Sequence, residues 1–162
     1  MDNFLERFRK DFELYLGSLF LSITTVIVIM NVFTRYFLRF TFTWAEEVAV
    51  GAFVWTIFLG FASAYKKKDL IGVEVLVVLL PEKGRNIVEF LTSIIITILS
   101  ALMFYFSYIY VAGSTKITAA LEVSYKYVYA SIVLAFALIT LYSIYFSIQS
   151  FKKLSFNKSI KN

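Results

Sequence analysis

The chain of 162 residues has no cysteine, no histidine and a single proline. Without cysteine there is no disulfide, no thiolate nucleophile and no iron–sulfur cluster. Without histidine there is no imidazole base and no bis-histidine haem site, and a zinc site built from carboxylates alone would be unusual. The composition therefore argues against an enzyme, and we expect no catalytic residue, no metal site and no cofactor.

Charge is also scarce, and its distribution decides the fold class. Charged residues make up 17% of the chain and apolar residues 60%, against about 45–50% apolar in soluble domains. An uncharged apolar run of about 18 residues or more predicts a transmembrane helix, whereas strands of a membrane β-barrel alternate apolar and polar residues. We therefore predict an all-α integral membrane protein with a membrane domain over residues 14–151. Its four spans are expected at about residues 14–37, 44–65, 90–115 and 127–151.

Short segments beside the spans have the pattern of helices that lie in the membrane interface. Residues 1–13 carry Phe4, Phe8 and Phe12 on one helical face, with charged residues between them. A solvated tail is the alternative for this segment. Residues 70–80 hold one charge, are too short to span, and predict a second interfacial helix.

Lysine and arginine flank the spans unequally. Twelve of the 16 lie in residues 1–13, in the link between spans two and three, and in the basic tail of residues 152–162. The other two links hold the remaining four lysine and arginine residues. Because positive residues favour the cytoplasmic side, both termini are expected in the cytoplasm. Lys66, Lys67 and Lys68 end the second span and are expected to be interfacial anchors, as are the three phenylalanines of residues 1–13. The net charge of +5 is better explained by lysine and arginine residues that flank the membrane spans than by nucleic-acid binding.

Within the second span, a small residue occurs at every fourth position and forms a stripe along one face of the helix. The stripe consists of Ala52, Thr56, Gly60 and Ala64. Small side chains let helix backbones approach closely in a membrane. The stripe is expected to serve helix packing, either within this chain or against a partner.

One charged group stands beside the short link between spans one and two. Arg35 precedes the link, and Trp44, Glu46 and Glu47 follow it. An arginine–carboxylate contact there would be directional and would pin the hairpin or face a partner. The alternative is that these charges are exposed and that their interaction contributes less than about 1 kcal/mol to stability. Thr43 and Glu46 also have the spacing of a capping box at the start of the second span.

Within the expected spans, four runs contain no Asp, Glu, Lys or Arg: residues 14–34, 48–65, 90–115 and 127–151. Transport pathways normally place charge or broken helices at mid-membrane. A chain that carries solutes alone, such as a self-sufficient four-helix multidrug-type exporter, would need a carboxylate deep in its first helix. Residues 14–34 have none, which leaves that function as the weaker alternative.

Several segments carry a family resemblance: Asn31–Tyr36, Trp44–Glu47, Phe53–Trp55, Ile71–Glu74 and Leu80–Pro81. Together they resemble the DctQ-like or SiaQ-like small membrane subunit of the tripartite ATP-independent periplasmic (TRAP) transporters. Leu70 stands where the family often has histidine, which removes a titratable group but leaves the architecture intact.

The resemblance implies a heteromeric complex in the bacterial inner membrane. A large membrane subunit would hold the substrate and sodium sites, and a periplasmic substrate-binding protein would deliver an organic acid, such as sialic acid or a C4-dicarboxylate. The small subunit would be a scaffold among membrane lipids. Arg35, Trp44, Glu46 and Glu47 would then be structural or partner-contact residues.

Overall fold

The computed structural model describes residues 11–68 and 82–159, and these form four long helices. They are α2 (Phe12–Phe37), α3 (Thr43–Lys67), α5 (Glu82–Gly113) and α6 (Lys126–Ser159). Each is long and apolar enough to cross a membrane. The prediction of four apolar helices is therefore confirmed.

The helix ends differ in places from the expected spans. α5 begins at Glu82, ahead of the uncharged run, and α6 continues to Ser159, into the segment expected as a basic tail. Phe12 and Glu13, expected in an interfacial helix, are the first two residues of α2. The rest of that expected segment (residues 1–10) and the expected interfacial helix at residues 70–80 lie outside the described residues.

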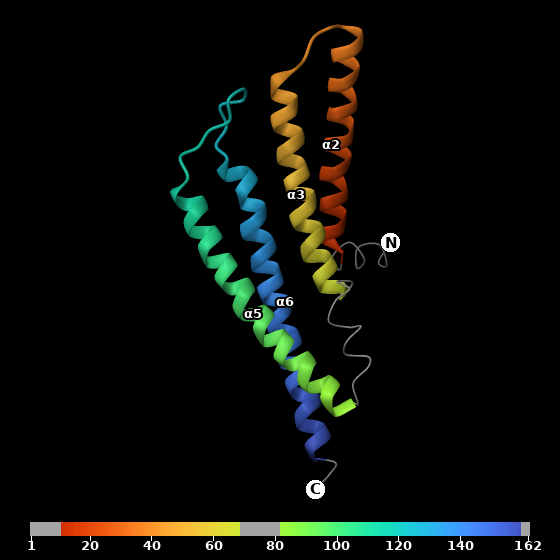
Figure 1. The fold of residues 1–162 in the computed structure, drawn as a ribbon, viewed down its shortest axis with the longest axis vertical. Coiled ribbons are helices and arrows are strands. Elements are labelled where there is room, and N and C mark those ends of the chain that lie inside the picture. Colours follow the sequence, from red (N-terminus) through yellow and green to blue (C-terminus); the bar gives the residue numbers. More distant parts are fainter. Residues whose placement is uncertain (1–10, 69–81, 160–162) are drawn as a thin grey trace, which may run out of the picture.

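The helices stand side by side in the order α2, α3, α6, α5, as Figure 1 shows. Within the described residues, the backbones of α2 and α3, of α3 and α6, and of α5 and α6 pack closely against each other. The fold is thus two antiparallel hairpins joined through their inner helices. Both short links, residues 38–42 and 114–125, lie at the same end of the array.

Small side chains on α3 allow this central helix to be packed from both sides. Ala45, Ala49, Ala52 and Ala62 are buried, the last beside Ala135 of α6. On α2, a Cβ added at Gly17 would lie 3.6 Å from Leu59 Cβ. The Thr56 hydroxyl lies 3.4 Å from the Gly17 carbonyl oxygen, so the α2–α3 contact is close enough for hydroxyl–backbone hydrogen bonding.

A line of hydroxyl groups joins α5 to α6 inside the apolar region. The Thr97 and Ser143 hydroxyls lie 2.7 Å apart, and Ser143 also donates to the Ser93 carbonyl oxygen at 3.0 Å. Ser143 is completely buried. Because lipid offers no hydrogen-bond partner, these hydroxyls are stable there only when they bond to each other or to the backbone.

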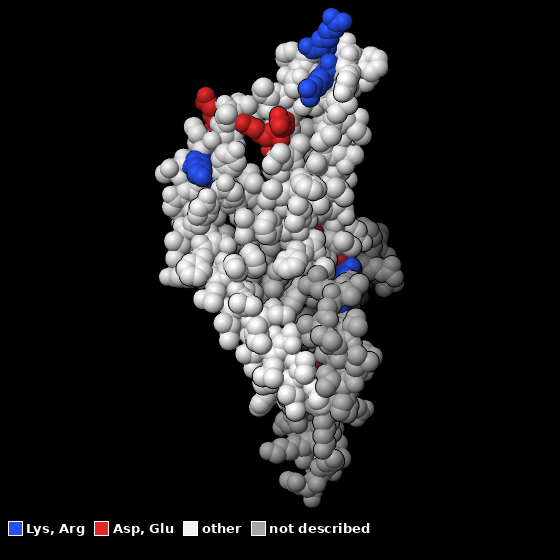
Figure 2. All heavy atoms as spheres, viewed as in Figure 1, with Lys and Arg blue, Asp and Glu red and all other residues white. Residues whose placement is uncertain are grey.

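The outer surface is largely apolar. Large hydrophobic side chains are exposed along α2 and α5, the two edge helices. Figure 2 shows charged atoms near the links and near the end of α3, with uncharged atoms between them. This banding is what a bilayer requires, because ionised groups are costly in its centre.

We predict that Gly17→Leu lowers the stability of the purified chain by about 1–3 kcal/mol, because a long side chain would force α2 away from α3. Gly17→Ala should change little, since its Cβ makes an ordinary contact. Gly60→Leu is the matched control, because a Cβ there has no atom within 4 Å among those described. Thermal unfolding in detergent measures the difference. Equal midpoints for Gly17→Leu and Gly60→Leu would contradict the close α2–α3 packing.

Candidate functional site

The polar side chains of interest form two groups at opposite ends of the array. Within residues 11–68 and 82–159, no group of three or more acidic, histidine or cysteine residues is arranged to hold a metal ion. One group surrounds Glu47, at the end where the links lie. The other surrounds Glu13, at the opposite end of α2 and α3.

Glu47 binds the link between α5 and α6 through both carboxylate oxygens. The backbone N–H of Ala120 donates to Oε1 at 2.8 Å, and that of Leu121 donates to Oε2 at 3.0 Å. Two successive backbone N–H groups form a concave anion site, and bonds to a charged acceptor are stronger than neutral ones. Glu47 therefore fastens the start of α3 to the link between α5 and α6. We call this contact the Glu47 clamp.

The clamped link has a defined conformation of its own. The backbone N–H of Thr118 donates to the Val123 oxygen at 2.8 Å, and that of Tyr125 donates to the Lys116 oxygen at 3.0 Å. The Thr118 hydroxyl accepts a further bond from the Val123 N–H at 3.1 Å. Glu122 takes a left-handed backbone conformation, with φ of 54°, and closes the turn. The result is a small hairpin rather than a loose connection.

Arg35 lies in the last turn of α2, but the described chain shows no ion pair between it and Glu46 or Glu47. The first hairpin is closed by Asn31 instead, whose side-chain oxygen accepts the Phe42 N–H at 3.2 Å. Trp44 packs near the Phe42 ring, with the ring centroids 5.7 Å apart. A partner-contact role for Arg35 and Glu46 remains a prediction.

The expected capping box at Thr43 and Glu46 is wrong. The residue that caps α3 is Phe42, and no side chain caps this helix end. The helix begins one residue earlier than the capping pattern requires, so Thr43 is already its first helical residue. Sequence spacing alone could not locate this start to one residue.

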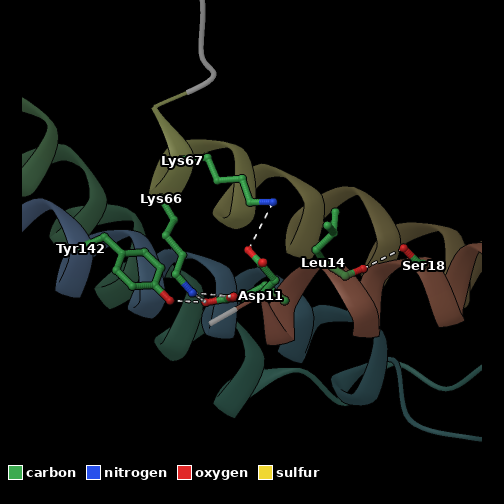
Figure 3. A network of polar contacts seen from close by, with 7 residues as sticks. Asp11, Leu14, Ser18, Lys66, Lys67 and Tyr142 are labelled. Carbon is green, nitrogen blue, oxygen red and sulfur yellow. Dashed lines mark hydrogen bonds and ion pairs between the residues drawn. The ribbon is translucent and has the colours of Figure 1, made fainter. Parts of the chain in front are cut away.

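The second group lies where α2 begins and α3 ends, and Figure 3 shows it. Glu13 is only 4% exposed. Lys66 Nζ donates to its two oxygens at 3.0 and 3.2 Å, and the Tyr142 hydroxyl of α6 donates to Oε1. Beside it, Lys67 Nζ pairs with Asp11 at 3.2 Å. We call Asp11, Glu13, Lys66, Lys67 and Tyr142 the Glu13 network.

The Glu13 network joins three helices through one buried carboxylate. Lys66 Nζ also lies 5.2 Å from the centre of the Tyr142 ring, a cation–π distance. Sequence reasoning assigned Lys66 to the interface and passed over Glu13 and Tyr142. A signal was present, because an antiparallel hairpin brings the start of one span beside the end of the next, here an acid opposite a lysine.

The other predicted residues have mixed surroundings. In the small-residue stripe, Ala52 is buried and Thr56 contacts α2, whereas Gly60 faces open space and Ala64 is half-buried. Lys68 Nζ lies 4.8 Å from the Phe146 ring centre, and Phe12 is exposed. Phe4 and Phe8 lie outside the described residues. Trp55, which the sequence did not single out for contact within the chain, donates to the Tyr127 carbonyl at 3.0 Å and ties α3 to α6.

Comparison with known proteins gives one family. Residues 24–153 match the model of the DctQ component of the tripartite ATP-independent periplasmic transporters. A TRAP transporter small permease protein of Haemophilus influenzae is 32% identical over 78 residues, which are 48% of each chain. The C4-dicarboxylate TRAP transporter small permease protein DctQ of Vibrio cholerae is 30% identical over 81 residues, 50% of this chain and 35% of that protein. The matches thus span half or less of the curated relatives' length.

We predict that Lys66→Met destabilises the purified chain by about 3 kcal/mol, because it leaves the buried Glu13 carboxylate without its counter-ion. The double variant Glu13→Gln with Lys66→Met should recover part of that loss, since neither charge remains. Lys67→Met is the control, because the partner Asp11 is more exposed and a surface pair contributes at most about 1 kcal/mol.

Chemical denaturation of the four proteins in detergent checks this prediction. Equal losses for Lys66→Met and Lys67→Met, or a double variant less stable than Lys66→Met alone, would show that Glu13 is not held by a buried ion pair.

Proposed function

Because this chain belongs to the DctQ component family of TRAP transporters, we propose that it is the scaffold subunit of a sodium-coupled importer of an organic acid. It is a multi-pass membrane permease subunit with four spans, and not an enzyme. In this role it stabilises the large membrane subunit, which holds the substrate and sodium sites. The observation that carries the proposal is the absence of Asp, Glu, Lys and Arg from residues 14–34, 48–65, 90–115 and 127–151.

The polar groups inside the spans support a structural role. Hydroxyls of Ser18, Ser22 and Thr25 donate to carbonyl oxygens one turn earlier on α2, at 2.8–2.9 Å. Those of Thr97 and Ser143 bond across α5 and α6. Groups already bonded within the chain are poorly suited to bind a passing anion or sodium ion. A scaffold needs no such free groups.

The orientation we propose follows from the lysine and arginine bias. Both termini lie in the cytoplasm of a bacterial cell, so the Glu13 network lies at the cytoplasmic face of the inner membrane and the Glu47 clamp at the periplasmic face. The links at the periplasmic face then contact the substrate-binding protein. Ile117, Leu121 and Val123 support this, because the clamped link exposes 40–63% of each of them.

The substrate class we propose is an organic acid such as a C4-dicarboxylate or sialic acid. The Vibrio cholerae relative is named for C4-dicarboxylate, and that name supports the dicarboxylate for this chain at modest identity. The proposal of sialic acid as the alternative substrate rests on the family resemblance of the sequence. The residues that would choose between the two acids belong to the partner subunits.

We predict that Arg35→Ala and Glu47→Ala each reduce copurification with a tagged large subunit, or reduce transport by the assembled complex, at least several-fold. Glu47→Ala frees the link of residues 114–125, and Arg35→Ala removes a cation left without an ion pair in the described chain. Lys116→Ala is the control, because it removes an exposed cation from the same face.

The measurement is recovery of the small subunit with the large one, followed by uptake in proteoliposomes. Normal recovery and normal uptake for both variants would overturn these roles of Arg35 and Glu47. The scaffold function itself fails if the wild-type chain does not copurify with the large subunit.

A further inference from the structure

The outer hairpin of α5 and α6 carries an open groove with a volume of about 240 Å³. Its lining residues are Phe106, Ser107, Tyr110 and Val111 of α5, and Tyr129 and Ile132 of α6. Sites for drug-sized ligands are larger, at about 300–1,000 Å³. A small, mainly apolar groove between two helices long and apolar enough to span a membrane suits an alkyl chain better than a polar solute.

The groove lies just inside the end of the hairpin. Tyr129 and Ile132 follow the first residue of α6 by three and six positions, which is about 4.5 and 9 Å along the helix axis. The Tyr129 ring centre is 5.5 Å from that of Tyr110 and 5.7 Å from that of Tyr125. Tyrosine rings favour the depth where acyl chains meet headgroups, because one end is apolar and the other is polar.

Lys126 is the charged residue of α6 that precedes the groove in the chain. It is the first residue of α6, one turn before Tyr129, so both lie on neighbouring parts of one helix face. Its side chain is exposed, and no carboxylate in the described chain lies within ion-pair distance of it. The acids near this link are Glu47, which is bound to backbone N–H groups, and the exposed Glu122.

Lys126 has no ion-pair partner among the described residues. The positive end of the helix dipole disfavours lysine at a helix N-terminus by about 0.3–1 kcal/mol. An anion bound from outside would remove that disadvantage. The charge of Lys126 and the apolar groove one to two turns below it together match a phospholipid, with its phosphate at the lysine and its chain in the groove.

We propose that the α5–α6 groove binds an anionic phospholipid, with one acyl chain between Phe106 and Ile132 and the phosphate group at Lys126. This inference requires only that the helices span a membrane, and it does not depend on the scaffold function. A zwitterionic lipid and a helix of another protein are the competing occupants.

The test is native mass spectrometry of the purified chain with equimolar phosphatidylglycerol and phosphatidylcholine of the same acyl chains. The wild type should retain phosphatidylglycerol about fivefold over phosphatidylcholine, which corresponds to about 1 kcal/mol for one lysine near anionic lipid. Lys126→Gln should bring the ratio close to one. Ile132→Trp, which fills the groove, should reduce retention of both lipids.

Lys116→Gln is the matched control, because it removes an exposed cation from the adjoining link and should keep the wild-type ratio. Three results would overturn the proposal. They are equal retention of the two lipids by the wild type, a wild-type preference for phosphatidylglycerol in Lys126→Gln, and loss of that preference in both lysine variants. The proposal is also wrong if the large subunit displaces the lipid and Ile132→Trp reduces recovery of that subunit, because the groove would then be a protein contact. Lys126→Gln alters only an exposed side chain, so its result stands even if Ile132→Trp fails to fold.

Discussion

A bilayer interior contains no water to satisfy polar groups, and this constraint accounts for most of the structure. Backbone hydrogen bonds must close within each segment, which leaves four helices. Charged side chains must stay at the ends of those helices or find partners, as Glu13 does. Hydroxyls between the ends must bond within the protein, as Thr97 and Ser143 do. The uncharged middle of each helix and the polar groups at the helix ends therefore have one physical cause.

Two polar contacts at opposite ends hold the hairpins in place. The Glu47 clamp joins the start of α3 to the link between α5 and α6. The Glu13 network joins α2, α3 and α6 at the other end. Between them, α3 and α6 pack through small residues such as Ala62 and Ala135. An array fastened at both ends suits the scaffold role proposed above.

The sequence predicted the helices well because each run is long and uncharged. It also pointed to Glu47, but through an expected hairpin or partner role, whereas the carboxylate binds backbone N–H groups 73 and 74 residues away. Backbone N–H groups carry no sequence signal, so that contact could not be predicted. Tyr142 was missed for a related reason: an apolar run of α6 contains several tyrosines, and only the packed helices show which one reaches Glu13.

We infer that the membrane interior of this chain is structural and carries no solute. The most direct test reconstitutes the purified chain in liposomes, alone and together with the large subunit and the binding protein, and measures sodium-driven uptake of radiolabelled organic acids. We expect no uptake above that of empty liposomes for the chain alone, and uptake only when the large subunit is present. Solute movement by the isolated chain would contradict this inference.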